Sequence, residues 1–173
     1  MLHSDIDSPV ILMCGISGSG KTYFSKKLEE KGYKRLSLDE HIWSLYGSGF
    51  SSFPSERRKL IFMQAAQEMD QQLAESIDKG EKVVLDSTMC KKIKREKTLA
   101  LCREHGVEPI FIYLETPLPL LSERLSHRRG TGPNDQIVSP EDLSSFYSNF
   151  EPPLPSEPHI VAKKLFKFIF EEV

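Results

Sequence analysis

A glycine-rich segment that directly follows an apolar run constrains this chain more than any other feature. The run is Val10–Cys14, and the segment is Gly15-Ile16-Ser17-Gly18-Ser19-Gly20-Lys21-Thr22. The segment fills every fixed position of the pattern G-x-x-x-x-G-K-[ST], which is typical of a phosphate-binding loop. Residues 23–31 then carry apolar side chains at helical spacing until Gly32. A buried strand therefore leads into the loop and a helix leaves it, the setting in which helix N–H groups hold a phosphate.

The residue types in this segment fit the phosphates of a nucleotide. Glycine lets the backbone approach the phosphates closely. Lys21 is expected to reach the β- and γ-phosphates, and the Thr22 hydroxyl is expected to complete the shell of a Mg²⁺ ion. A turn that only joins a strand to a helix would explain neither residue. The residues expected to bind the nucleotide are Gly15, Ser17, Gly18, Ser19, Gly20, Lys21 and Thr22.

The composition indicates one small, nearly neutral domain. Its 173 residues suffice for one core, so residues 1–173 are expected to form a single domain. The net charge of −2 favours neither nucleic acid nor an anionic membrane as a partner. Residues 1–9 lack the cationic and then apolar segments of a secretory signal, and no apolar run has the length of a membrane span. We expect a cytoplasmic protein whose cysteines, Cys14, Cys90 and Cys102, stay reduced.

Apolar strand-like runs alternate with helical patterns, which is typical of βα units around a parallel sheet. Strands are predicted at 10–14, 35–38, 82–86 and 109–114, and helices at 23–31, about 55–77, 91–105, 117–127 and from 140 onward. Residues 159–162 could add a short strand, but Val161, Leu165, Phe168 and Glu172 have a spacing that favours a terminal helix. The pattern predicts a three-layer α/β fold with four or five parallel strands and helices on both faces.

Two aspartates stand where strands are predicted to end. Asp39 follows the second strand, and Asp86 ends the third. Ligands collect at the carboxyl ends of the strands in open α/β sheets, so both carboxylates should face the γ-phosphate. Phosphoryl transfer needs one carboxylate to act on the attacking hydroxyl and another near the magnesium shell. We assign Asp39 to the acceptor hydroxyl and Asp86 to Mg²⁺ through water, although either could instead cap the following helix.

Three arginines lie where the helix predicted at 117–127 ends, namely Arg124, Arg128 and Arg129. They lead into residues 128–139, which are rich in turn-forming residues and are expected to form a mobile lid loop. Such a lid would close over the nucleotide, exclude water and bring guanidinium groups to the transferring phosphoryl group. Arg124 and Arg128 share a helical face, and the predicted catalytic set is Lys21, Asp39, Arg124 and Arg128. A solvated helix end whose cations complement the helix dipole is the alternative.

Several pieces of the sequence occur together: the phosphate-binding loop, Asp39, Leu85-Asp86-Ser87-Thr88, Arg124 with Arg128, and Phe150-Glu151-Pro152-Pro153. In this combination, over about residues 10–153, the chain resembles the small P-loop kinases of the polynucleotide-kinase and zeta-toxin group. The resemblance implies a fold of the nucleoside-monophosphate-kinase type with an arginine lid. It also implies ATP and Mg²⁺ as cofactors, the aspartate after the second strand as the base, and a family arginine at Arg95.

The acceptor side carries fewer signals. His41 and Trp43 stand where that family often has an arginine, and they could contact a substrate, but packing into the core is the expectation for both. A basic run could hold a phosphorylated or polymeric acceptor, although a solvated helix face is expected; it consists of Lys91, Lys92, Lys94, Arg95 and Lys97. The sequence does not name the acceptor.

We predict an ATP- and Mg²⁺-dependent kinase that moves the γ-phosphoryl group to a hydroxyl of a small molecule or nucleotide. A nucleotide-dependent regulatory switch is one alternative, but guanine specificity usually rests on an Asn-Lys-x-Asp segment, which the chain lacks. A zeta-toxin-like kinase, which would inhibit growth on expression, is another. A polynucleotide 5′-hydroxyl kinase is the third, and it would usually need a larger basic surface than this composition favours.

Overall fold

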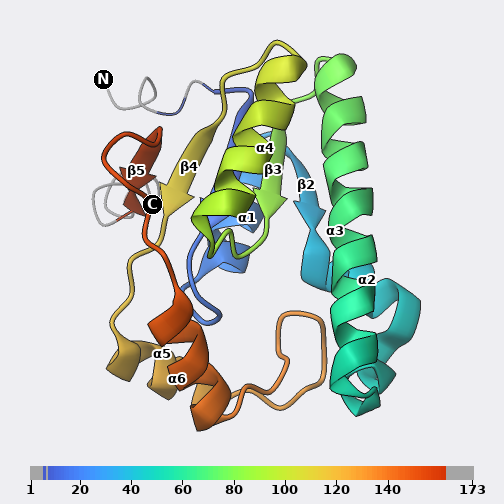
Figure 1. The fold of residues 1–173 in the computed structure, drawn as a ribbon, viewed down its shortest axis with the longest axis vertical. Helices are drawn as coiled ribbons and strands as arrows, with labels where there is room; N and C mark the ends of the chain where they lie inside the picture. Colours follow the sequence, from blue (N-terminus) through green and yellow to red (C-terminus); the bar gives the residue numbers. More distant parts are fainter. Residues whose placement is uncertain (1–5, 7, 163–173) are drawn as a thin grey trace.

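The computed structural model describes residue 6 and residues 8–162. Strands and helices alternate through most of this range (Figure 1). In chain order the elements are β1 (Val10–Cys14), α1 (Lys21–Glu30), β2 (Lys34–Ser37), α2 (Leu38–Tyr46), the 3₁₀ helix η1 (Gly47–Ser52), α3 (Ser55–Asp78), β3 (Val83–Asp86), α4 (Lys92–Glu104), β4 (Ile110–Tyr113), α5 (Leu118–Ser126), α6 (Pro140–Asn149) and β5 (His159–Val161).

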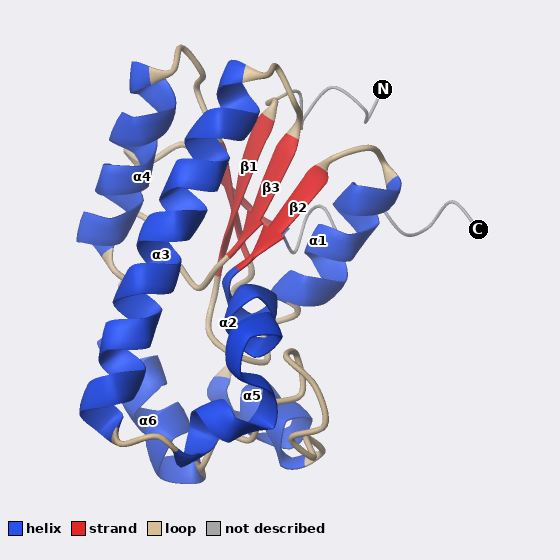
Figure 2. Cartoon of the chain, turned by 90° about the vertical axis from the view of Figure 1, so that its right-hand side faces the viewer, coloured by secondary structure: helices blue, strands red, loops and turns tan. Residues whose placement is uncertain are grey.

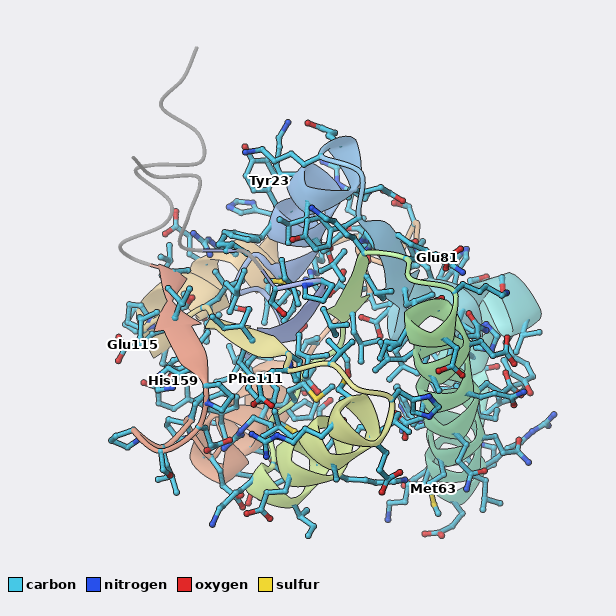
Figure 3. The ribbon with its side chains drawn as sticks, turned by 90° about the horizontal axis from the view of Figure 1, so that it is seen from above. Tyr23, Met63, Glu81, Phe111, Glu115 and His159 are labelled. Atoms are coloured by element: carbon cyan, nitrogen blue, oxygen red, sulfur yellow. The ribbon has the colours of Figure 1, made fainter. Side chains whose placement is uncertain are left out.

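The strands of the described region form one parallel sheet in the order β2-β3-β1-β4-β5. Helix α1 covers one face of the sheet, and α3 and α4 cover the other (Figure 3). The central strand β1 is fully buried, and its side chains pack into the core on both faces of the sheet. Val10, Leu12 and Cys14 pack towards α3 and α4, whereas Ile11 and Met13 pack towards α1. The predicted three-layer α/β fold is therefore confirmed.

The carboxyl ends of the strands lie at one end of the molecule, where α2, α5 and α6 gather (Figure 2). The register sets Ser37 of β2 beside Asp86 of β3, and Cys14 of β1 beside Tyr113 of β4. Segments that follow different strands therefore start next to one another. This is the end of an open α/β sheet at which ligands bind.

The last strand differs from the sequence-based preference. We expected a terminal helix that includes Val161 as its first apolar position. Instead, β5 pairs in parallel with β4, with Ile160 opposite Ile112 and Val161 opposite Tyr113. The helix prediction is therefore wrong at residues 159–161, because pairing with the edge of β4 outweighs the local helical spacing. Its remaining positions, Leu165, Phe168 and Glu172, lie outside the described residues.

No membrane-spanning helix occurs in the described part of the chain, because none of its helices combines enough length with enough apolar character.

The segment before β5 is attached to the fold by a buried arginine. Arg95 of α4 is fully buried and donates to both carboxylate oxygens of Glu157, at 2.6 and 3.1 Å. It also donates to the backbone carbonyls of Met89 and Glu151, at 3.0 and 2.7 Å. A guanidinium taken out of water needs such a set of acceptors. The arginine that the family resemblance singles out thus has a structural role here.

We expect Glu157→Gln to lower the free energy of unfolding by about 3 kcal/mol, because it leaves the Arg95 charge buried without its carboxylate. Urea unfolding followed by circular dichroism measures the change. The control is Glu30→Gln, which removes an exposed ion pair with Lys27 on α1 and should not change stability. Equal unfolding midpoints for the two variants would contradict the anchoring role of Arg95.

Candidate functional site

The loop between β1 and α1, called the phosphate loop below (residues 15–22), has a conformation that glycine adopts readily. Gly18 and Gly20 have φ angles of +87° and +100°, in the left-handed region that other residues avoid. A Cβ atom on Gly18 would also lie 3.1 Å from Cγ of Leu125 in α5. Helix α1 begins at Lys21, so its first N–H groups face the loop. The loop therefore has the backbone and the helix dipole of an anion site.

Lys21 and Ser19 place polar atoms inside the phosphate loop. Lys21 is buried, and its Nζ donates to the carbonyl of Ile16 at 3.1 Å. Burial lowers the pKa of Lys21, while Asp86 and Asp39 act in the opposite direction. The Ser19 hydroxyl is buried without a hydrogen-bond partner among the described residues. Since such a group is costly to bury, its position fits a ligand with strong acceptor oxygens such as phosphate.

An open pocket of about 170 Å³, the phosphate pocket, collects most of the predicted site residues. It is lined by Ser17, Gly18, Gly20, Lys21, Thr22, Asp39, Asp86, Arg124, Arg128 and Asn134. Two predicted residues lie outside this lining. The N–H of Gly15 donates to the carbonyl of Thr88 at 3.1 Å, and Ser19 lines the neighbouring pockets.

The two aspartates reach the phosphate pocket from different elements, and neither caps a helix. Ser37 is the N-cap of α2, and Lys91 is the N-cap of α4. Asp39 lies in the first turn of α2, exposed to the pocket. The protein around it limits its hydration and raises its pKa, although Lys21 and Arg128 act to lower it. A raised pKa makes this carboxylate a stronger base than an ordinary aspartate.

A buried arginine on β2 fixes Asp86. Arg35 donates from Nη2 to Oδ2 of Asp86 at 2.8 Å and from Nε to the Ser25 hydroxyl at 2.7 Å. Its Nη1 donates to Oε2 of Glu40 at 2.7 Å. The side chains of Arg35 and Asp86 are only 4% and 6% exposed. The second oxygen of Asp86, Oδ1, accepts a hydrogen bond from none of the described residues, so it is the oxygen that can serve a ligand.

Asn134 joins the loop of residues 128–139 to Thr22 and to α2. Its Nδ2 donates to Oε1 of Glu40 at 2.9 Å, and its Oδ1 lies 3.3 Å from the Thr22 hydroxyl. Burial acts against ionisation of Glu40, but the hydrogen bonds from Arg35 and Asn134 outweigh it and lower the pKa. An ionised Glu40 only accepts, so the amide must turn its NH₂ group to Glu40 and its oxygen to Thr22. The Thr22 hydroxyl thus donates to Asn134 and keeps its lone pairs for a cation.

Two of the three predicted lid arginines contact the phosphate loop. Arg124 donates from Nη1 to the carbonyl of Gly18 at 3.1 Å, and Arg128 donates from Nη1 to the Ser17 hydroxyl at 3.2 Å. Burial lowers the pKa of Arg128, and Asp39 opposes this shift. Arg129 lines a different pocket, beside α2.

The loop of residues 128–139 is folded on itself. Oδ2 of Asp135 accepts from the N–H groups of Arg129 and Thr131, each at 3.1 Å, and from the Thr131 hydroxyl at 2.8 Å. The N–H of Gly130 donates to the carbonyl of Asp135 at 2.8 Å. These bonds make the tip a compact turn, and its mobility stays a prediction.

Two further pockets adjoin this region. One, of about 560 Å³, shares Gly18, Gly20 and Arg124 with the phosphate pocket and extends over Leu114 and Leu120. The other, of about 240 Å³, is called the α2 pocket. It is lined by Ile42, Trp43, Gly47, Ser48, Phe50, Ser51, Arg58, Arg129, Gly130, Gln136 and Ile137. The phosphate loop contributes residues to the first of these pockets and none to the second.

Trp43 and His41, the two residues that the sequence placed near the acceptor, have different surroundings in the structure. Trp43 is partly exposed and lines the α2 pocket, so the expectation that it packs into the core is wrong. Its position near the end of a short helix leaves the core contact to Ile42. Nε2 of His41 is hydrogen-bonded to Oε2 of Glu68 on α3.

Each cation of the basic run at the start of α4 contacts a carboxylate, and Lys94 and Lys97 share the carboxylate of Asp70. The ion pairs of the run are Lys91–Glu151, Lys92–Glu96, Lys94–Asp70, Lys97–Asp70 and Arg95–Glu157. The lysines therefore form a solvated helix face, as expected.

Sequence reasoning missed Arg35, Glu40 and Asn134. A signal existed for Arg35, because a charged residue next to the buried Leu36 in a strand needs a partner. No such signal marks Asn134, which lies in a loop without periodicity.

The site residues fit a nucleotide with Mg²⁺ better than a bare metal ion. Among the described residues, no three histidine, cysteine or carboxylate side chains gather into a metal site. Thr22 and Asp86 can each offer an oxygen, and Mg²⁺ commonly combines one or two protein oxygens with phosphate oxygens and water.

Comparisons with known proteins agree with this geometry. The model of an AAA domain family matches residues 10–153. A candidate kinase from Chloroflexus aurantiacus has a similar structure, with a TM-score of 0.69 and 21% identity over 88% of this chain and 85% of that chain. A sugar kinase from a Janibacter species gives 0.63 and 19%, over 88% and 83%. A gluconokinase from Sinorhizobium meliloti gives 0.59 and 21%, over 88% and 80%. No curated protein sequence matched.

We expect Lys21→Ala to weaken nucleotide binding by about 100-fold, because a charge-assisted hydrogen bond to phosphate is lost from a buried position. Calorimetric titration with ADP and Mg²⁺ measures this. Lys27→Ala, which removes an exposed cation from the same helix, is the control and should bind normally. If both variants bind ADP equally well, the phosphate loop is not the nucleotide site.

Proposed function

The chain belongs to this AAA domain family of P-loop kinases, and we propose that it is an ATP- and Mg²⁺-dependent kinase that phosphorylates a hydroxyl of a small molecule. The observation that carries the proposal is the phosphate pocket, in which the phosphate loop and the Asp39 carboxylate face the same space. A protein that only bound a nucleotide would not need a base opposite the γ-phosphate. The neighbouring folds named as sugar kinase and gluconokinase support a small polyol as the acceptor.

The donor half holds ATP by its phosphates. Backbone N–H groups of the phosphate loop, the Ser19 hydroxyl and the Lys21 ammonium bind phosphate oxygens. Thr22 and Asp86 would hold Mg²⁺, which would offset negative charge on the phosphates. Asn134 orients the Thr22 hydroxyl for this task, because it accepts the hydroxyl proton.

The acceptor half supplies a base. Asp39 takes the proton of the acceptor hydroxyl while that oxygen forms a bond to the γ-phosphorus. The bond from phosphorus to the β–γ bridging oxygen breaks, and ADP leaves with the electron pair. Arg124 and Arg128 lie over the phosphate loop, where their charges stabilise the transferring group.

The free cysteines fit a reducing compartment, so we place the reaction in the cytoplasm.

The direct test is a screen in which the protein, ATP and Mg²⁺ are incubated with hydroxyl-bearing metabolites and each product is sought by its mass shift. A phosphorylated product supports the proposal. ADP formation that no acceptor stimulates would instead favour the regulatory switch.

We expect Asp39→Asn to lower phosphoryl transfer by about 100-fold or more while nucleotide affinity changes little, because only the base is lost. Single-turnover transfer and ADP titration separate the two effects. Glu141→Gln, a neutralisation at an exposed position on α6, is the control. Transfer by Asp39→Asn at the wild-type rate would disprove the assignment.

We expect the acid limb of kcat against pH to lie above the ordinary aspartate range, because Asp39 must be ionised to act and its pKa is raised. Activity therefore falls as the pH decreases through this raised pKa. Arg128 acts to lower the pKa of Asp39, so Arg128→Gln should move the limb to higher pH. Arg124→Gln should lower kcat without moving it. An unchanged limb in Arg128→Gln would mean that another group titrates.

A further inference from the structure

We propose that the α2 pocket binds the acceptor and selects a small hydroxyl compound that carries an anionic group, either a carboxylate or a phosphate. This inference rests on the proposed function, since it names the substrate class of the same reaction. The pocket lies between α2, η1, the start of α3 and the loop of residues 128–139.

Helix α2 and the loop of residues 128–139 line both the α2 pocket and the phosphate pocket, with different residues. Ile42 and Trp43, which line it, follow Asp39 by one turn of α2 and share its helical face. On the opposite wall, Arg128 lines the phosphate pocket and Arg129 lines the α2 pocket. A compound whose hydroxyl lies at Asp39 therefore places the rest of its body in the α2 pocket.

The charge of this pocket is positive and uncompensated. Arg58 and Arg129 line it, and no carboxylate does. Among residues 8–162, neither guanidinium has an ion-pair partner. Asp135, in the same loop, directs its Oδ2 to the backbone N–H groups of Arg129 and Thr131 instead. Arginine in such a position matches the paired oxygens of a carboxylate or phosphate.

The remaining wall fits a small organic body. Trp43, Ile42 and Ile137 offer apolar surface, and Ser48 and Ser51 offer hydroxyl groups. A polymer would need a continuous cationic track beyond the pocket. The lysines at the start of α4 do not extend one, because each already contacts a carboxylate, with Asp70 shared by two of them. A compact anion with hydroxyl groups therefore fits the described surface better than a nucleic acid does.

Trp43 provides a direct readout, because it is the only tryptophan of the chain and it lines the pocket. Its fluorescence is recorded with a non-hydrolysable ATP analogue and Mg²⁺ in excess, so that added anions cannot enter the phosphate pocket. Two matched pairs are titrated at constant ionic strength: gluconate against glucitol, and glucose 6-phosphate against glucose. Within each pair only the anionic group distinguishes the binding chemistry.

The anionic member of at least one pair should bind about tenfold or more tightly than its neutral partner, as expected for a charge-assisted contact. A response to gluconate alone assigns the carboxylate, and a response to glucose 6-phosphate alone assigns the phosphate. The preference should fall below about threefold in the double variant Arg58→Gln/Arg129→Gln. Arg57→Gln is the control, because Arg57 lies over the Phe53 ring, 3.9 Å from its centroid, and does not line the pocket.

Three results would overturn the inference: equal binding within both pairs, no change in Trp43 fluorescence with any of the four compounds, or tighter binding of a 5′-hydroxyl oligothymidylate than of all four. Because the readout is binding, it does not require phosphoryl transfer. Anion selection without any transfer would count against the proposed kinase, whereas transfer to a neutral polyol would count against this inference alone.

Discussion

The buried guanidinium of Arg35 is the interaction on which the geometry of the site depends. It lies on β2 and contacts Asp86 of β3, Ser25 of α1 and Glu40 of α2. Without this cation, the Asp86 carboxylate, which is only 6% exposed, would lose its charged partner, and an unpaired buried charge costs several kcal/mol. Through Glu40 the same network reaches Asn134 and the hydroxyl of Thr22. One charge thus sets the relative positions of the elements proposed to hold the nucleotide and the elements proposed to face the acceptor.

Helix α2 contributes residues to the phosphate pocket from its first turn and to the α2 pocket from its later residues. Its first turn carries Asp39, whose position follows from the cap at Ser37 and from the ion pair of the neighbouring Glu40 with Arg35. Its last turns carry Ile42 and Trp43 in the wall of the α2 pocket. In the proposed function, chemistry and recognition therefore belong to one short helix but to different residues. Under that proposal, changes in the second half of α2 and in η1 would alter the acceptor without altering the base.

Much of the fold and the location of the site could be predicted from the sequence, because both follow from local patterns and parallel topology. The motif of residues 15–22 needs only its own strand and helix, and Asp39 and Asp86 meet because parallel strands end together. The sequence indicates that Arg35 in a strand needs a partner, but it does not indicate that this partner is Asp86, 51 positions away, nor that Asn134 contacts Glu40, 94 positions away. The exposure of Trp43 and the pairing of β5 depend likewise on neighbours that periodicity does not encode.

The turn around Asp135 has a consequence for the thermodynamics of closure. Its internal hydrogen bonds keep the tip of the loop in one shape, so the tip can move as a body without losing its fold. Among the described residues, three hydrogen bonds join this loop to the phosphate loop and α2, namely Arg128–Ser17, Asn134–Thr22 and Asn134–Glu40. At about 1 kcal/mol each, their sum is small. A lid of this kind, as predicted for the loop, would lose little conformational entropy on docking, which would favour fast and reversible gating over slow refolding of a disordered segment.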